Sequence, residues 1–276
     1  LNRINPRYLR RQTRLLAGLL SVALAGNHMA VAADAQSSSP NATPANAPPA
    51  TTQPERQVDP IFAEFTAWTQ RYLEADAAAR AALEADGAAL AQRRREALAK
   101  LIESDPKQAL QLTVPLQVRG QLPASVSQQL EERVSGRGEF MVLIFDFIDP
   151  NTGERSSKIQ RSATIKGKAY NAHVYGRRRG LSSKVSIPLH GIAIERALAV
   201  HESPVRMLEP GEVPDPAAPV GNPDKRCPIC NAAEATNIIV DVGGTIYYFD
   251  QAEHLQKFVA AIVAKEAVVD PRSSGP

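Results

Sequence analysis

The chain has 276 residues, of which 43% are hydrophobic, 22% charged and 5% aromatic. This composition excludes a chain that is disordered throughout and a protein with many membrane spans. The formal net charge of +3 comes from five arginines within residues 1–32, which contain no acidic residue. The rest of the chain carries 27 basic and 29 acidic side chains. It therefore lacks the composition of a globally basic nucleic-acid-binding protein, and we expect no nucleic-acid partner.

The first 32 residues show the order of regions that is typical of a secretory signal peptide. Arginines between positions 3 and 14 precede the apolar run 15–25. At 1.5 Å per residue this run is too short to span a bilayer about 30 Å thick. Small residues at 30–32 (Ala-Val-Ala) then offer a cleavage site. We expect residues 1–32 to be a signal peptide, no transmembrane segment, and a secreted or periplasmic mature protein.

Residues 33–58 are rich in Pro, Ser and Ala and are predicted to form a disordered linker, because they hold too few apolar residues to offset the cost of ordering. A helical region is predicted over 59–136. It begins at Asp59-Pro60, an N-cap residue followed by a proline at the first helical position, and Asp105-Pro106 repeats this start signal.

Apolar residues in the helical region recur at helical spacing. The first stripe comprises Ile61, Phe65, Trp68 and Tyr72. An Ala- and Arg-rich helix is then predicted to run to about Glu103, and Val126, Leu130 and Val134 predict a further short helix before Gly136. Such stripes are typical of packing faces rather than of cofactor sites.

The hydrophobic pattern changes after the helical region. Residues 140–147 form a continuous apolar run rich in strand-forming residues, and Asp149 to Gly153 form a turn signal. Further extended stretches are predicted at 162–165, 169–175, 184–188 and 192–200. Strands at this spacing predict a small antiparallel sheet or barrel over 137–210. A second linker (211–225), a Cys-x-x-Cys module (226–268) and a tail (269–276) complete the predicted domain organisation.

The stretch from Lys158 to Lys184 contains eight basic residues and no acidic one. One interpretation is a cationic face for an anionic partner, such as a glycan, a lipid surface or an acidic protein. The other is a solvated hairpin rim, because runs of charge commonly serve solvation. The partner of the protein stays unknown from its sequence.

The two cysteines of the chain, Cys227 and Cys230, form a Cys-Pro-Ile-Cys motif. Such a pair can bind a metal, exchange disulfides or form a structural disulfide. A thioredoxin-like site is excluded, because that motif opens a helix, whereas here a strand follows. The segments 237–242 and 245–249 are predicted to form a hairpin around Gly243-Gly244, followed by an amphipathic helix.

Two further candidate ligands lie at the start of this last helix. Asp250 is predicted to be its N-cap, forming a capping box with Glu253, and His254 lies four residues after Asp250 on the same side of the first turn. Two thiolates, one carboxylate and one imidazole are a sensible donor set for zinc, whereas copper(I) prefers thiolates. A site with four protein ligands is typical of a structural zinc.

The segment from Cys227 to about Lys265 resembles the small treble-clef metal-binding modules called YHS or TRASH. The family pattern is a Cys-x-x-Cys, a hairpin ending in Tyr-Tyr-Phe-Cys, and another cysteine four residues later. Here the hairpin ends in Tyr247-Tyr248-Phe249, and Asp250 and His254 take the places of the last two cysteines. The resemblance implies a metal site formed by Cys227, Cys230, Asp250 and His254.

Alternatives to the metal site remain open. Asp250 is fully explained as an N-cap, and His254 as a solvated helical residue. A disulfide between Cys227 and Cys230 would suit an oxidising exported compartment, and idle thiols are a third possibility. The predicted fold class is α+β: an N-terminal helical region, a small antiparallel β-rich domain and a C-terminal knuckle–hairpin–helix module of treble-clef type.

No catalytic motif is present: there is no His-Glu-x-x-His, no Gly-x-Ser-x-Gly and no glycine-rich phosphate loop. His190 and His201 are predicted to be packed or surface residues. We expect an exported, non-enzymatic protein with a binding or accessory role and a C-terminal structural zinc. The alternative is a leader or propeptide-like region associated with a secreted protease. This alternative is based on the helical and β-rich body, which weakly resembles N-terminal regions of large secreted bacterial proteins, and it implies a disulfide between Cys227 and Cys230.

Overall fold

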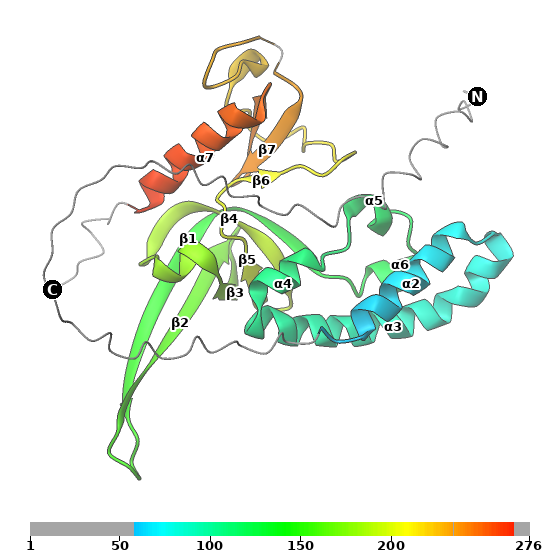
Figure 1. Cartoon of the computed structure of the whole chain (residues 1–276), viewed down its shortest axis with the longest axis horizontal. Coiled ribbons are helices and arrows are strands. Elements are labelled where there is room, and N and C mark those ends of the chain that lie inside the picture. Colours follow the sequence, from blue (N-terminus) through cyan, green and yellow to red (C-terminus); the bar gives the residue numbers. More distant parts are fainter. Residues whose placement is uncertain (1–57, 234, 268–276) are drawn as a thin grey trace, which may run out of the picture. The chain divides into compact units, whose positions relative to one another are not determined.

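The computed structural model of the chain describes residues 58–233 and 235–267. The predicted signal peptide, all but the last residue of the linker 33–58 and the predicted tail lie outside these ranges. The described part has the predicted α+β class, with helices first, then strands that are mainly antiparallel, and a helix near the C-terminus. Figure 1 shows this order along the chain.

The helical region contains two long helices and three short ones. They are α2 (Ile61–Glu74), α3 (Ala77–Ser104), α4 (Pro106–Gln111), α5 (Leu116–Arg119) and α6 (Ala124–Ser127). The start signal Asp105-Pro106 is confirmed, since the Asp105 carboxylate accepts the N–H of Gln108 at 3.0 Å. At the other signal α2 begins at Ile61 and Pro60 is the N-cap residue, while the carboxylate of Asp59 accepts the N–H of Ile61 at 2.9 Å. Capping by these carboxylates satisfies backbone donors that lack a partner within the helix.

The helices α2 and α3 pack around Trp68, which is fully buried. The indole N–H of Trp68 donates to the carbonyl of Leu83 at 3.0 Å, and its ring fills the space beside Gly87. A buried ion pair closes this part of the core, because Arg94 Nη1 lies 2.7 Å from Glu131 Oε2 and both side chains are almost completely shielded from solvent. The predicted apolar stripe is therefore a packing face.

Five strands form a closed barrel in the order β1-β2-β3-β5-β4. The strands are β1 (Glu132–Ile148), β2 (Arg155–Ile165), β3 (Lys168–Val174), β4 (Lys184–Ile194) and β5 (Ala197–Val200). Only the β3–β5 pair is parallel, and the other pairs are antiparallel. A short 3₁₀ helix η1 (Gly176–Gly180) lies between β3 and β4. The barrel interior is filled by small and branched apolar side chains around Phe140.

Two details of the barrel differ from the predicted elements. The short helix predicted to run through Val134 ends at Ser127, and Val134 lies in β1, where burial alternates with the period of a strand. The extended stretch predicted over 192–200 is divided between β4 and β5 by a turn in which Glu195 adopts a φ of 56°. The first error assigns the start of a strand to a helix, and the second joins two strands into one.

The hairpin of β1 and β2 extends beyond the rest of the barrel (Figure 1). Its turn is the predicted one, since the N–H of Gly153 donates to the carbonyl of Asp149 at 2.8 Å. The predicted apolar strand 140–147 lies within β1, but only Phe140 is buried in the barrel core, with Val142 packed against it. Residues 143–148 are exposed.

The C-terminal module is a three-stranded sheet covered by one helix. Its elements are β6 (Arg206–Met207), β7 (Ile238–Val242), β8 (Thr245–Phe249) and α7 (Ala252–Ala267), with strand order β6-β7-β8. The predicted hairpin and helix are thus present. Phe249 is fully buried between the sheet and α7, with its ring centroid 5.2 Å from that of Phe258.

The structure differs from the predicted linker 211–225, because part of this segment pairs with the module. Val220 forms a parallel bridge with Ile246, and Gly221 donates its N–H to the carbonyl of Ile246 at 2.9 Å. Since β6 also belongs to the module's sheet, the module begins near Val205 rather than at 226. The Pro- and Asp-rich composition of this segment concealed a pairing that is made by backbone groups.

Polar contacts join the module to the barrel. The hydroxyl of Ser135 donates to Asp241 Oδ2 at 2.6 Å, and Arg177 Nη1 forms an ion pair with Glu266 Oε2 at 2.7 Å. Within the two described ranges, no helix is long and apolar enough to cross a membrane.

The basic stretch 158–184 does not form one continuous cationic face. Arg178 is buried and donates to the carbonyls of His201 and Pro188 at 2.7 and 3.0 Å, and burial lowers its pKa to about 10. Lys184 is also buried. The anionic partner stays a prediction that concerns only the exposed members of the stretch.

His190 and His201 are packed residues, as expected. The rings of His190 and His201 stack with centroids 4.8 Å apart and planes 18° apart, and His190 is buried.

Candidate metal centre

The turn that carries the two cysteines lies between the 3₁₀ helix η2 (Pro223–Lys225) and β7. Two backbone hydrogen bonds shape it: the N–H of Cys227 donates to Ala232, and the N–H of Asn231 donates back to Cys227, each at 2.9 Å. Asn231 adopts a φ of 61°, a left-handed conformation that asparagine tolerates better than most residues. The tight turn brings the two thiols together, with Cys227 buried and Cys230 exposed.

The other two candidate ligands follow the hairpin. Asp250 comes directly after β8, and His254 lies in the first turn of α7. The aromatic packing between β8 and α7 fixes the start of the helix against the end of the strand, because Phe258 contacts both Tyr247 and Phe249. This packing determines where the Asp250 and His254 side chains lie.

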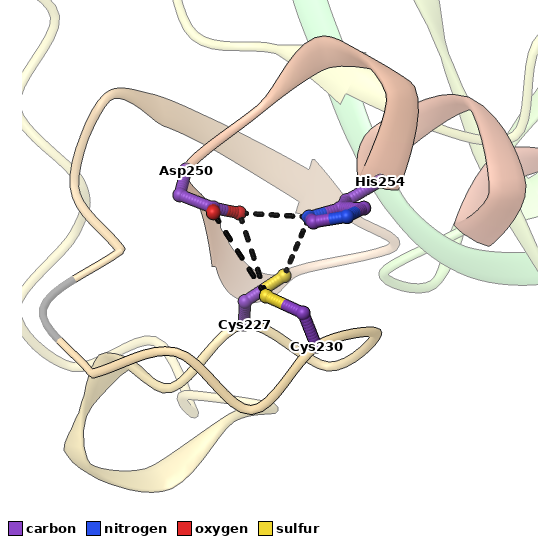
Figure 2. A group of neighbouring side chains, drawn as sticks. All are labelled: Cys227, Cys230, Asp250 and His254. Carbon is purple, nitrogen blue, oxygen red and sulfur yellow. Dashed lines mark hydrogen bonds and ion pairs between the residues drawn. The ribbon is translucent and has the colours of Figure 1, made fainter.

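The four side chains meet at one point (Figure 2). One potential ligand atom from each of Cys227, Cys230, Asp250 and His254 lies within 4.8 Å of all the others. Cys227 Sγ is 3.5 Å from His254 Nδ1, and Cys230 Sγ is 3.8 Å from Asp250 Oδ2. Around a tetrahedral zinc, with bonds of 2.0–2.3 Å, ligand atoms are about 3.3–3.8 Å apart. The two contacts of the cysteines with His254 and Asp250 fall in this range, and the cluster could hold a metal ion.

The carboxylate of Asp250 lies beside the thiol of Cys230 and the ring of His254. Its Oδ1 lies 2.9 Å from His254 Nδ1, and this contact lowers the pKa of the Asp250 carboxyl. The structure differs from the predicted capping box, because α7 begins at Ala252 and Gln251 is the residue that precedes it. The carbonyl of Gln251 accepts the N–H of Leu255 at 3.3 Å, which is the bond expected of an N-cap residue.

The charge balance around Cys230 favours a cation. A hydrogen bond with the backbone of Ala232 lowers the pKa of the Cys230 thiol, but desolvation, the Cys227 thiol and the Asp250 carboxylate together raise it above its usual range. The Cys230 thiol thus resists ionisation without a counter-charge. A divalent cation reverses this preference, because a thiol that binds a metal is deprotonated.

Two asparagines support the cluster and were not predicted from the sequence. Asn222 is buried, and its amide donates to the carbonyls of Arg226 and Tyr248 at 2.6 and 2.9 Å, while its oxygen accepts the N–H of Tyr248 at 3.1 Å. Asn222 therefore ties the segment before Cys227 to strand β8. Asn237 donates to the carbonyl of Asp250 at 3.1 Å and holds the loop from the other side.

No protein-family model, curated protein or solved structure matches the chain. Four predicted ligands from two separate segments are brought together, and this cluster could hold a metal ion.

Proposed function

We propose that the protein is exported and that its C-terminal module binds one structural zinc ion through Cys227, Cys230, Asp250 and His254. The single observation that carries the proposal is that all four ligand atoms lie within 4.8 Å of one another. The module would serve a binding or accessory role, and its resemblance to YHS or TRASH modules agrees with this interpretation.

The donor set favours zinc over other common metals. Sulfur ligands disfavour calcium and magnesium, which take oxygen ligands, and the carboxylate and imidazole disfavour copper(I). Zinc accepts a mixed set of sulfur, nitrogen and oxygen in tetrahedral geometry. Because the protein supplies all four ligands, no position is left for water or substrate, which supports a structural role.

The small hydrophobic core of the module explains what a bound metal would contribute. This core consists mainly of side chains from short strands and from one face of helix α7. So small a unit buries little apolar surface, and bound zinc links the segment before β7 to the start of α7. Metal binding would thereby contribute directly to the stability of the module.

The zinc proposal is tested by measuring metal content in purified protein by inductively coupled plasma mass spectrometry, under reducing conditions. We expect about one zinc per chain, and none in Cys227→Ser. Asp250→Asn should weaken zinc binding by more than the roughly 10–100-fold that loss of an outer-sphere partner costs. Glu253→Gln is the matched control, because Glu253 is a nearby exposed carboxylate that pairs with Lys257 instead.

A different result would support a disulfide at this site instead of a metal. Protein purified without chelator and without reductant that carries no metal, and whose mass is two hydrogens lower than the reduced form, would contain the Cys227–Cys230 disulfide. Export is tested separately, by intact-mass analysis of the protein in the periplasmic or secreted fraction. Loss of residues 1–32 is the expected result, and an uncleaved chain in the cytoplasm would contradict it.

A further inference from the structure

The part of the β1–β2 hairpin that leaves the barrel is called the arm here and comprises residues 143–160. Pairing of β1 with β4 ends at Phe140, and the hydroxyl of Ser183 then accepts the N–H of Val142 at 2.9 Å. Pairing of β2 with β3 begins only at Ser162. The arm is therefore a two-stranded ribbon whose two outer edges have no neighbouring strand within the described part of the chain.

The strand β1 of the arm is apolar, although its side chains are exposed. Ile144 is 65% exposed and Phe145 is 44% exposed. Leu143, Phe147 and Ile148 are exposed as well. A two-stranded ribbon is marginally stable in water by itself, and exposed apolar patches of this kind mark interaction surfaces.

Polarity in the arm is divided mainly by strand and not by face. Phe145 pairs with Lys158 and Phe147 with Ser156 on one face, which holds an apolar β1 half beside a polar β2 half. The other face is mixed, because Ile148 pairs with Arg155, Asp146 with Ser157, and Ile144 with the exposed Ile159. A ribbon that lies in a lipid surface needs one wholly apolar face, which the arm does not have.

This division assigns different properties to the two free edges. The β2 edge carries Arg155 and Lys158, and charged residues of this kind protect an edge strand against pairing. The β1 edge has one charged side chain, Asp146, whose carboxylate already accepts a hydrogen bond from Ser157. The β1 edge is the one that is open to another strand.

We propose that the β1 edge pairs with the β1 edge of a second copy of this chain, in antiparallel orientation about a two-fold axis. The resulting four-stranded sheet would have two apolar β1 strands at its centre and two polar β2 strands at its edges. The positive charges of the two copies would lie far apart, on the outside. An isologous pairing of this kind closes on itself and does not propagate into fibres.

The two-fold axis limits the register of the pairing. Directly opposed residues lie on the same face of a sheet, whereas successive residues of one strand alternate between the two faces. The two-fold axis must therefore place one residue of β1 opposite the same residue of the second copy. Centring on Asp146 would oppose two carboxylates. Centring on Phe145 opposes the two Phe145 rings and places Leu143 of one copy against Phe147 of the other, so we assign this register.

Cysteine cross-linking in the full chain tests both the pairing and its register. In Phe145→Cys, the two introduced thiols lie directly opposite each other, and mild oxidation should give a covalent dimer linked at position 145. Phe147→Cys is the matched control, with the same face and a similar exposure of the native residue. In the assigned register, its two thiols are about 13 Å apart, four residues along the strand, and should not cross-link.

Peptide mapping by mass spectrometry identifies the linked positions, because Cys227 and Cys230 also contain thiols. Sedimentation velocity over a range of concentrations gives an independent readout. We expect a concentration-dependent dimer for the native chain, a monomer for Phe145→Lys, and a dimer for Val213→Lys, which changes a residue that is 82% exposed outside the arm.

The proposal is overturned by any of three results. The native chain could stay monomeric at all concentrations, it could cross-link as readily at 147 as at 145, or Phe145→Lys could leave the dimer intact. Flotation of the native chain, but not of Phe145→Lys, with anionic phosphatidylserine vesicles in the absence of a dimer would assign the arm to a membrane instead.

Discussion

His190 is the residue whose surroundings most strongly oppose ionisation. Burial, then the stacked ring of His201 and the guanidinium groups of Arg178 and Arg206, lower the pKa of His190 from 6.5 to about 3. The barrel therefore holds this imidazole neutral at neutral pH. In the unfolded chain the same group takes up a proton below its ordinary pKa of about 6.5.

This difference makes stability depend on pH in a defined direction. Between about pH 6.5 and pH 3 the unfolded state binds more protons at His190 than the folded state, so acid favours unfolding. We expect stability to fall, as pH decreases through this window, by up to about 1.4 kcal/mol per pH unit from this group. His190→Phe retains an aromatic ring for stacking and should show a flatter loss. Urea denaturation at several pH values measures the difference, and parallel curves for both proteins would refute it.

At the scale of elements, α3 contains a glycine that helix propensity alone would replace. Gly87→Ala in an open helix should stabilise by about 1 kcal/mol. Here a Cβ at position 87 would lie 2.0 Å from Trp68 Cζ2. The indole cannot move away easily, because it stacks on Tyr72 with centroids 5.1 Å apart and donates a hydrogen bond to Leu83.

We therefore expect Gly87→Ala to destabilise the protein, by about 1–3 kcal/mol, the range typical of overpacked cores. Ala89→Gly, at an exposed position of the same helix, is the control for propensity and should cost about 1 kcal/mol. Thermal unfolding followed by circular dichroism compares the two. An increase in stability for Gly87→Ala would show that the α2–α3 contact is looser than the structure indicates.

The elements also show what local sequence patterns predict well. Start signals such as Asp105-Pro106 act within one turn of helix and can be recognised locally. Cys227 and His254 are 27 residues apart and were recognised by residue type, since thiols and imidazoles are common metal ligands. An asparagine carries no such signal, and the role of Asn222 depends on reaching the carbonyl of Tyr248, 26 residues away, across a folded sheet.

Strand β1 illustrates the opposite case. Its continuous apolar run is typical of a buried strand, yet residues 143–148 leave the barrel. The polar sequence of the partner strand contained the missing signal, since Arg155 to Gln160 cannot line a core. The register shows that these two segments pair with each other, so that the apolar strand has a polar strand as its neighbour.

At the scale of the whole chain, the apolar cores of the barrel and of the C-terminal module are separate clusters. The helical core, which contains Trp68, is a further cluster. The contacts between the barrel and the module that were described above are polar, such as Ser135 with Asp241. We therefore expect that loss of the zinc ion proposed for the module would affect the module first.

This separation gives a clear prediction for chelation. Addition of EDTA to reduced, zinc-loaded protein should remove part of the helical circular dichroism as α7 loosens, while the fluorescence of Trp68 stays unchanged. Trp68 is the single tryptophan of the chain and reports only on the helical region. A shift of its emission on chelation would mean that the module and the helical region unfold together.

Helix α7 connects the candidate metal centre to the barrel through its two ends. His254 lies in the first turn, and Glu266, in the last, pairs with Arg177 of η1. At 1.5 Å per residue these two side chains are attached about 18 Å apart along the helix. The helix thus holds these two side chains at a fixed separation along its axis. A paramagnetic Co²⁺ in place of zinc would lie within nuclear magnetic resonance range of the barrel, and the shifts of barrel signals would encode the orientation of the barrel relative to the ion.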